Sequence, residues 1–438
     1  MVLDAARLRV EGVYEQQQAG NYMFRVKVPA GVISTEQAMK VADVADRVAG
    51  GRLHLTTRNS IEYHWVKGDD LSEAMRSLAA VGLISRGACG GAVRGIVCST
   101  PFSPAYPVVQ VLGQKLHRHF TGNPHFEGLP KKFKMAVNGD YSDPRYLIQD
   151  VALVYVGTDY ETARYDLWTA GGLGREPSPG YLFEKAVPEE RIIPLVEAII
   201  RVYKERTPPP KRLKHLLREI GREEFERLVH EKLAGQPELS IRDAFEKRLT
   251  ALPAGNEPHR VEAGVFAGEL SSETLRKLAG IAGRFAAGYL VLTSTQNVAF
   301  LLPDGADPTA VRTALAEAGF DGTGRDQRTV FRICPGNHEC KMGLSPTRDI
   351  ARQLLEAMGD AGEGCSWAIS GCFNSCSQPQ LADVGIVTVK SVANPDGTRS
   401  PQFDLYRRTE EDGFGERIRE RISVDELLEA VRQMNAAS

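Results

Sequence analysis

The sequence lacks long apolar runs and a strong charge of either sign. No stretch of its 438 residues approaches the roughly 18 apolar residues of a membrane-spanning helix. The N-terminal segment, MVLDAARLRVEG, lacks the basic and then apolar parts of a secretory signal. The formal net charge is −2, which points to neither nucleic acid nor an anionic membrane as a partner. We therefore expect a cytoplasmic protein whose basic residues act locally.

Cysteine is scarce as well. Seven cysteines, an odd number, in so long a chain do not indicate a disulfide framework. Apolar residues (42%) and charged residues (25%) are at ordinary globular levels, and the length predicts about two to four structural units. The sequence also lacks a dinucleotide-binding fingerprint, because Gly172 and Gly174 are not followed by the required third glycine.

Four of the cysteines form two tight groups. Cys334 and Cys340 make a C-x5-C, Cys372 and Cys376 make a C-x3-C, and 31 residues separate the groups. Four thiolates are the ligand set of an iron–sulfur cluster or of a structural zinc ion. Zinc sites favour shorter spacings in both pairs, so the pattern favours a cluster, with zinc and unligated thiols as alternatives. Cys365 could compete as a ligand, but a buried free thiol is the preferred interpretation.

An internal repeat indicates the organisation of the chain. Residues 31–66 align without gaps on residues 268–303, and 12 of the 36 positions are identical. Two copies so far apart indicate a duplication and not a solenoid, whose repeats are shorter and more numerous. A cysteine- and glycine-rich stretch follows each copy, at 87–100 and at 332–342. The duplicated unit therefore extends to half of the molecule.

Each copy predicts a helix followed by strands. Ser34 and Ser271 are the expected helix N-caps, and Gly50–Gly51 ends the first helix. Alternating apolar residues then predict strands around 53–55 and 61–65. Helices packed on sheets, twice over, predict an α+β fold with pseudo-twofold symmetry.

Four segments resemble the siroheme-dependent nitrite and sulfite reductases. ISGCFNSCSQPQLADVGI (369–386) is similar to the cluster-binding segment of that family. LTTRNSIEYHW (55–65), GACGGAVRGIV (87–97) and LPKKFKMAV (129–137) match three further segments in the expected order. The resemblance covers nearly the whole chain, and it implies ferredoxin-like half-domains combined with siroheme- and 4Fe-4S-binding domains.

The resemblance implies a specific division of the chain. It places a first ferredoxin-like half-domain at 1–80 and a first siroheme- and substrate-binding domain at 81–203. A helical connector at 204–250 joins them to a second half-domain at 251–310. The 4Fe-4S cluster and siroheme-binding domain, with a C-terminal helix, occupies 311–438.

The resemblance also implies roles for the cysteines and for the residue between the last two. It makes a 4Fe-4S cluster and siroheme the cofactors, and Cys376 the bridge between cluster and siroheme iron. Asn374 is expected to orient the cluster loop. The implied cluster ligands are Cys334, Cys340, Cys372 and Cys376.

Basic residues complete the implied site. Arg58 and His64 match positions that contact siroheme, whereas the role of His54 stays open. The second repeat carries Thr295 in place of Arg58, which predicts one active site. Converging cations suit both the carboxylates of siroheme and a small oxyanion. The implied substrate-binding residues are Arg25, Arg94, Lys132 and Lys134.

Lys132 and Lys134 together favour sulfite over nitrite, because a dianion gains more from an extra cation than a monoanion does. We therefore predict six-electron reduction of sulfite to sulfide, with nitrite reduction to ammonia at the same site as the alternative. Electrons must come from a ferredoxin or a separate flavoprotein.

Three further readings and one hypothesis remain open. Within the same fold, a precorrin-3B synthase-like monooxygenase would depend on oxygen, and a non-catalytic siroheme and cluster electron-transfer protein would show no turnover. A structural zinc protein would be colourless. A thioether link between Tyr14 and Cys89 is a hypothesis that intact mass would test.

Overall fold

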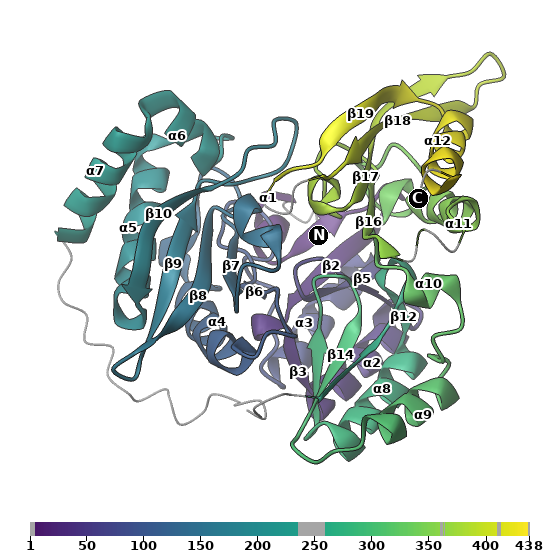
Figure 1. Ribbon diagram of the computed structural model, residues 1–438, viewed down its shortest axis with the longest axis horizontal. Coiled ribbons are helices and arrows are strands. Elements are labelled where there is room, and N and C mark those ends of the chain that lie inside the picture. Colours follow the sequence, from purple (N-terminus) through teal and green to yellow (C-terminus); the bar gives the residue numbers. More distant parts are fainter. Residues whose placement is uncertain (1–4, 235–258, 360–361, 363, 410–412, 437–438) are drawn as a thin grey trace.

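A computed structural model of the chain describes residues 5–234, 259–359, 362, 364–409 and 413–436. Two interlocked half-domains occupy the lower right of Figure 1, with one sheet domain on the left and a second at the upper right. The predicted α+β fold with internal duplication is confirmed. Across the described residues, none of the helices combines the length and apolar character needed to cross a bilayer.

The two half-domains share the order strand, strand, helix, strand, strand, helix; the first adds a helix and a strand before it, and the second adds a helix after it. The first consists of α1 Ala5–Val10, β1 Val13–Glu15, β2 Asn21–Lys27, β3 Val32–Ser34, α2 Thr35–Val48, β4 Arg52–Leu55, β5 Ser60–Lys67 and α3 Leu71–Ala79. The second consists of β11 His259–Ala263, β12 Glu269–Ser271, α8 Ser272–Phe285, β13 Tyr289–Leu292, β14 Val298–Leu302, α9 Pro308–Glu317 and α10 Arg325–Arg328.

The half-domains exchange strands. β3 of the first copy pairs with β13 of the second, and β12 of the second pairs with β4 of the first. The sheets therefore run β1-β2-β5-β4-β12 and β11-β14-β13-β3. Helices α2 and α8 pack against each other, and apolar residues of both copies share one core. The duplication is thus a single folded unit and not two separate domains.

Local signals explain the helices of the repeat. The Ser34 hydroxyl accepts from the Gln37 N–H at 3.1 Å in a capping box, and the Ser271 hydroxyl accepts from the Thr274 N–H at 3.0 Å. After α2, Gly50 and Gly51 have φ of 59° and 73°, a conformation that favours glycine. The predicted caps and the predicted helix end are therefore confirmed.

The flanking sheet domains are also alike. The first contains β6 Val97–Cys98, α4 Tyr106–Phe120, β7 Met135–Asn138, β8 Val151–Asp159, β9 Thr162–Thr169, β10 Tyr181–Pro188, α5 Glu189–Arg206, α6 Leu213–Ile220 and α7 Arg222–Ala234. The second contains β15 Phe331–Ile333, α11 Thr347–Ala357, β16 Trp367–Ser370, β17 Val384–Ala393, β18 Arg399–Arg407, β19 Glu416–Ile422 and α12 Val424–Ala436.

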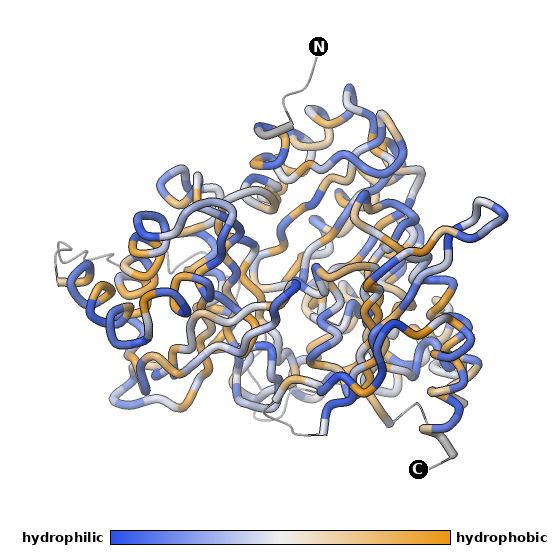
Figure 2. Tube along the Cα trace, turned by 90° about the horizontal axis from the view of Figure 1, so that it is seen from above, coloured by the Kyte–Doolittle hydropathy of each residue, from blue (hydrophilic) through white to orange (hydrophobic). Residues whose placement is uncertain are grey.

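In both sheet domains three parallel strands are followed by two antiparallel ones. The first sheet has the order β10-β9-β8-β7-β6 and the second β15-β16-β17-β18-β19. Each has its own apolar core. The hydrophobic stretches run mostly through the interior, and hydrophilic stretches lie mostly at outer turns (Figure 2). The duplication therefore includes the sheet domains.

Helices α6 and α7 belong to the first sheet domain. Leu213, Phe225 and Val229 are buried in the same core as its strands, and α7 packs on α5. The described part of the predicted connector is thus packed against the sheet domain, whereas residues 235–250 lie outside the described residues. The same holds for 251–258 of the predicted second half-domain, and the domain boundaries stay a prediction.

Candidate active site

The loop between β4 and β5 carries Arg58 into the space between the half-domains and the first sheet domain. Its guanidinium donates to Gly95 O at 2.7 Å, Met135 O at 3.2 Å and Gln149 Oε1 at 3.1 Å. Its Nε is buried without a partner among the described residues. Burial and the neighbouring Arg94 lower the pKa of Arg58 to about 9, so an anion at this point would be strongly favoured.

Arg25 lies on the same sheet as this loop. It stands opposite Glu62, since β2 pairs with β5, and the two side chains form an ion pair at 2.5 Å. His64 Nε2 lies 3.4 Å from the other carboxylate oxygen of Glu62. The His54 ring centroid is 6.0 Å from that of His64. Arg25, Glu62 and both histidines therefore share one polar cluster.

Arg94 is held by the turn that precedes it. Its guanidinium donates to Gly90 O at 2.8 Å, Gly87 O at 3.2 Å and Ala92 O at 3.4 Å. Gly87 and Gly90 have positive φ, which lets the backbone curl around the side chain. Burial lowers the pKa of Arg94. Carbonyl oxygens fix the guanidinium without neutralising its charge.

Lys132 and Lys134 lie on the segment that enters β7. The N–H of Phe133 donates to Ala92 O, and the N–H of Arg94 donates to Phe133 O, so this segment runs beside Arg94. Phe133 is buried in the core, and the two lysines alternate with it. Burial and Arg212 lower the pKa of Lys132 to about 8.

Neither lysine has a compensating carboxylate close by. Burial and Lys132 hold the pKa of Lys134 well below its usual value. No hydrogen bond or ion pair of either ammonium group is found within the part of the chain that the structure describes. The structure therefore brings Arg58, Arg94 and both lysines together in one strongly basic region.

Two basic residues of this region were not predicted from the sequence. Arg212 donates to Asp150 Oδ2 at 2.6 Å and acts electrostatically on both lysines. The sequence predicts a connector at this position. Arg212 reaches the site only because α6 folds back onto the first sheet domain. Lys27 is buried beside Arg94, and its Nζ has no partner among the described residues. Its place two residues after Arg25 on one strand was the available signal.

The cysteines come from the second sheet domain. Cys334 directly follows β15, and its Sγ accepts from the N–H of Gly371 at 3.1 Å. Burial raises the pKa of the Cys334 and Cys372 thiols and that of Cys340 to about 11. All three thiols are within electrostatic range of Cys376. The four cysteines therefore lie near one another in the second sheet domain, and their role as cluster ligands stays a prediction.

Contacts tie this cysteine group to the basic region. The Thr57 hydroxyl donates to Cys376 O at 2.8 Å, and Lys132 acts on both Cys372 and Cys376. Asn374 hydrogen-bonds Cys372, as a residue that orients this loop would. Among the described residues no three His, Cys, Asp or Glu side chains converge closely enough to hold one metal ion.

The remaining cysteines lie elsewhere. Cys98 is buried in the first sheet domain, and Cys365 is partly buried against the core of the second. Cys89 is buried, and it lies with Tyr14 within electrostatic range of Arg25. A link between Tyr14 and Cys89 stays a prediction.

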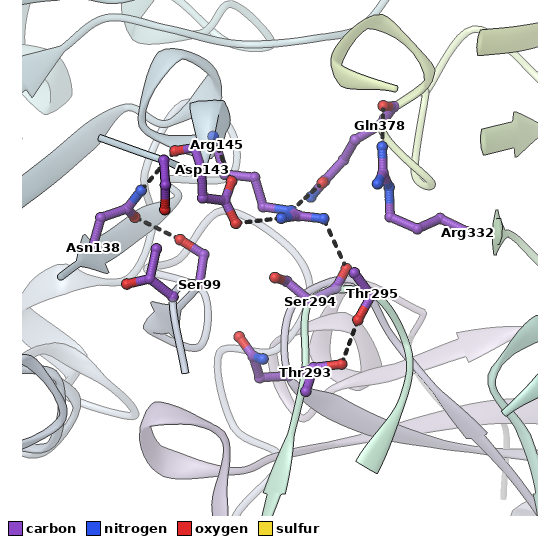
Figure 3. A network of polar contacts seen from close by, with 12 residues as sticks. Ser99, Asn138, Asp143, Arg145, Thr293, Ser294, Thr295, Arg332 and Gln378 are labelled. Atoms are coloured by element: carbon purple, nitrogen blue, oxygen red, sulfur yellow. Dashed lines mark hydrogen bonds and ion pairs between the residues drawn. The ribbon is translucent and has the colours of Figure 1, made fainter. Parts of the chain in front are cut away.

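Around the loop of the second copy that matches the Arg58 loop, the described arginines Arg145 and Arg332 are held by oxygen acceptors. Arg145 donates to Gln378 Oε1 at 2.8 Å and to Ser294 O at 3.3 Å, and it pairs with Asp143 (Figure 3). Arg332 donates to Gln378 O at 3.3 Å. The loop that matches the Arg58 loop thus lies among satisfied polar groups.

The residues of the basic region fit a group with several carboxylates. Arg58, Arg94, Lys132 and Lys134 are cations with no carboxylate partner, and their pKa values are lowered by burial. The Nδ1 atom of His64, which is buried without a partner among the described residues, adds further hydrogen-bonding capacity. Bound anions would compensate these charges. The nearby thiols fit an iron–sulfur cluster.

Two family models match the chain, and together they cover more than half of it. A nitrite and sulphite reductase 4Fe-4S domain matches residues 105–237. A nitrite/sulfite reductase ferredoxin-like half domain matches residues 14–81 and again 255–318. The second model therefore finds the same duplication that the sequence and the strand exchange indicate.

Named relatives align over nearly the full chain. The sulfite reductase [ferredoxin] 2 of Mycolicibacterium paratuberculosis is 24% identical over 96% of this chain and 80% of its own. The ferredoxin–nitrite reductase of Synechococcus elongatus is 27% identical over 95% of this chain and 86% of its own. The solved structure of the Mycobacterium tuberculosis NirA protein has a TM-score of 0.83 and 22% identity, and the match covers 99% of this chain and 86% of that one.

Proposed function

The chain belongs to the siroheme-dependent nitrite and sulfite reductase family, and from this premise we propose that it reduces sulfite to sulfide. It is an oxidoreductase whose cofactors are siroheme and a 4Fe-4S cluster. The overall step adds six electrons to sulfite and, with protons, releases its three oxygen atoms as water. The choice of sulfite is the part that goes beyond family membership.

One observation carries this choice: Lys132 and Lys134 are both half-buried and unpaired beside Arg94. Two uncompensated ammonium groups next to a guanidinium attract a dianion more strongly than a monoanion. Their lowered pKa values also make them able proton donors. Each oxygen that leaves as water needs protons, and a half-buried ammonium group at the substrate can supply them.

The roles of the remaining residues follow from their positions. We assign Cys334, Cys340, Cys372 and Cys376 as cluster ligands, with Cys376 as the bridge to siroheme and Asn374 as the residue that orients the loop. Arg58 and His64 would hold siroheme carboxylates, and Arg212 extends this set. Arg25, Arg94, Lys132 and Lys134 would bind the oxyanion. When bound, siroheme and the cluster supply the electron transfer.

A ferredoxin is the proposed electron donor, and a separate flavoprotein is the alternative. Two of the relatives carry ferredoxin in their names, and the sequence shows no dinucleotide-binding fingerprint of its own. Reduction of the protein by ferredoxin, compared with reduction by an NADPH-dependent flavoprotein, would decide between them.

Nitrite reduction to ammonia is the second candidate, and one observation favours it. The ion pair of Arg25 with Glu62 removes one cation from the count of free positive charges. A relative named as a nitrite reductase is also similar at 27% identity. Both candidates use the same residues and differ in the charge of the anion bound.

The test compares Lys134→Asn with Lys131→Asn in the holoenzyme. We expect the wild type, supplied with reduced methyl viologen, to have a higher kcat/KM for sulfite than for nitrite. Lys134→Asn should lower kcat/KM for sulfite by about 100-fold and for nitrite by about tenfold or less. Lys131 is exposed on the same segment, so its variant should behave as the wild type. A wild type that prefers nitrite would overturn the proposal.

A further inference from the structure

We propose that Glu62 is a specificity-determining residue: by pairing with Arg25 it lowers the positive charge of the substrate site and so reduces the preference for a dianion over a monoanion. The inference deepens the proposed function and rests on it. Glu62 acts through Arg25 and not by contact with the oxyanion, so it is a positioning residue.

The position of Glu62 is fixed by the sheet. On β5 it stands opposite Arg25 of β2 on one side and opposite His54 of β4 on the other. Its Oε1 accepts from Arg25 Nε at 2.7 Å and lies 2.5 Å from a second guanidinium nitrogen. His64, two residues along the strand, approaches the other oxygen. Backbone pairing therefore holds the carboxylate against the Arg25 side chain.

The carboxylate is charged in this setting. Burial alone would raise the pKa of Glu62, but Arg25 and His64 hold it well below its usual value. The side chain of Glu62 is 7% exposed and that of Arg25 is 28% exposed, so water screens the pair weakly. Burial lowers the pKa of His54 to about 3, so this ring is neutral near pH 7. The charge of Glu62 is therefore compensated mainly by Arg25.

The effect of the Arg25–Glu62 ion pair depends on the other charges of the site. Arg94 is held by carbonyl oxygens, and Lys132 and Lys134 have no carboxylate partner. Arg212 is paired with Asp150 at 2.6 Å, so it adds little net charge. Removing the charge of Glu62 would add one full positive charge to the site. That charge acts twice as strongly on a dianion as on a monoanion at the same distance.

The inactive copy supplies a matched control. Position for position in the repeat, Arg25 corresponds to Glu262 and Glu62 to Ala299, which face each other across β11 and β14. Glu262 is partly buried, and it accepts from Thr295 at 3.1 Å and Thr293 at 3.3 Å. It is thus a partly buried carboxylate on an equivalent strand, in the copy whose loop carries Thr295 in place of Arg58.

The experiment uses three variants of the holoenzyme: Glu62→Gln, Glu62→Asp and Glu262→Gln. Sulfite and nitrite are compared at a pH at which sulfite is a dianion. Dissociation constants come from titration of the visible spectrum, and kcat/KM comes from turnover with reduced methyl viologen. The ratio of the sulfite to the nitrite value is the readout, because a general loss of fold or cofactor affects both anions alike.

We expect Glu62→Gln to move both ratios toward sulfite by about tenfold. Glu62→Asp, which keeps the charge, and Glu262→Gln should leave them at the wild-type value, even where absolute rates fall. An unchanged ratio in Glu62→Gln, a shift toward nitrite, or an equal shift in Glu62→Asp would overturn the inference. If the wild type reduced neither anion, the proposed function would fail, while the ratio of dissociation constants would still test Glu62.

Discussion

The two copies of the repeat have the same backbone but opposite polar chemistry. Asn59 and Gln296 occupy equivalent positions with φ of 52° and 69°. Asn59 donates to Leu292 O, and Gln296 donates to Leu55 O, so each loop is anchored to the other copy. Next to these anchors the first copy carries Arg58 and the second Thr295. A symmetric framework thus presents a guanidinium in one copy and a hydroxyl in the other.

The two copies also differ in whether their buried polar groups have hydrogen-bond partners. In the first copy Arg58 Nε, Lys27 Nζ and His64 Nδ1 are buried without a partner among the described residues. Near the matching loop of the second copy, Glu262 accepts from two threonines, and Arg145 of the first sheet domain is bound by Gln378, Ser294 and Asp143 (Figure 3). Buried polar groups without partners are costly unless a ligand completes them. Arg58 Nε and Lys27 Nζ therefore mark a part of the first copy that a bound ligand would complete.

In the sheet domains it is the second half of the chain that supplies the chemically special residues, the cysteines. In the first sheet domain, Gly139 directly follows β7 and Thr100 lies just after β6. The N–H of Gly139 donates to the hydroxyl of Thr100 at 2.6 Å. The second domain has Gly371 N–H donating to the Cys334 thiol at 3.1 Å. The same backbone donor thus meets a hydroxyl in one domain and a thiol in the other. Cations come from the first half of the chain, and thiols come from the second.

The largest expected effect comes from making the second sheet domain resemble the first. Cys334→Ser replaces the thiol by a hydroxyl that can still accept from Gly371, but it removes a cluster ligand. We expect loss of most of the bound iron, loss of the cluster absorbance and no measurable turnover. Cys98→Ser, which changes a buried thiol in the first sheet domain, should retain iron. Full iron content in Cys334→Ser would contradict the ligand assignment.

The next effect comes from making the first repeat resemble the second. Arg58→Thr copies the residue of the inactive loop and leaves the carbonyl oxygens of Gly95 and Met135 without this donor. We expect kcat/KM to fall by about 100-fold or more, together with weaker retention of siroheme. The control is Thr295→Val, which removes the hydroxyl at the equivalent position of the second copy. It should lower stability slightly and leave kcat/KM unchanged. Equal losses in both variants would show that the two loops matter only for folding.

Local signals in the sequence explain how much of this could be predicted. Ser34, Ser271 and the paired glycines mark helix ends through contacts within a few residues, so they were found. The alignment of the two copies also showed that Thr295 replaces Arg58. The exchange of β3 and β12 was not predicted, because an alignment of repeats does not tell which copy a strand pairs with.

Some site residues cannot be predicted from the sequence, because contacts between distant segments bring them to the site. Arg212 reaches the site only because α6 folds back onto the first sheet domain, a contact between distant segments. Glu62 looks like an ordinary polar residue of an alternating strand until Arg25 is found opposite it. Lys27 resembles a solvated lysine in the sequence, yet it is buried. Motifs identify residues that act directly, whereas compensating charges emerge only from the fold.

The smallest effect concerns this buried lysine, whose counterpart in the second copy is Gly264. Burial and Arg94 lower the pKa of Lys27 to about 7, from an ordinary value of 10.5, while Cys89 and Glu127 act in the opposite direction. Between these two pH values the unfolded chain binds one proton more than the folded protein. The free energy of unfolding therefore rises with pH, by at most about 1.4 kcal/mol per pH unit from this group.

Lys27→Met should remove this contribution and stabilise the protein most below pH 7, where the wild type must keep a buried charge. Urea unfolding midpoints measured from pH 6 to pH 9.5 would show a smaller rise with pH in Lys27→Met than in the wild type. Lys185→Met, at an exposed position, should follow the wild type. Parallel curves for Lys27→Met and the wild type would mean that Lys27 keeps its proton when folded. The active copy would then hold one more buried cation than we infer, and the charge difference between the two copies would be larger.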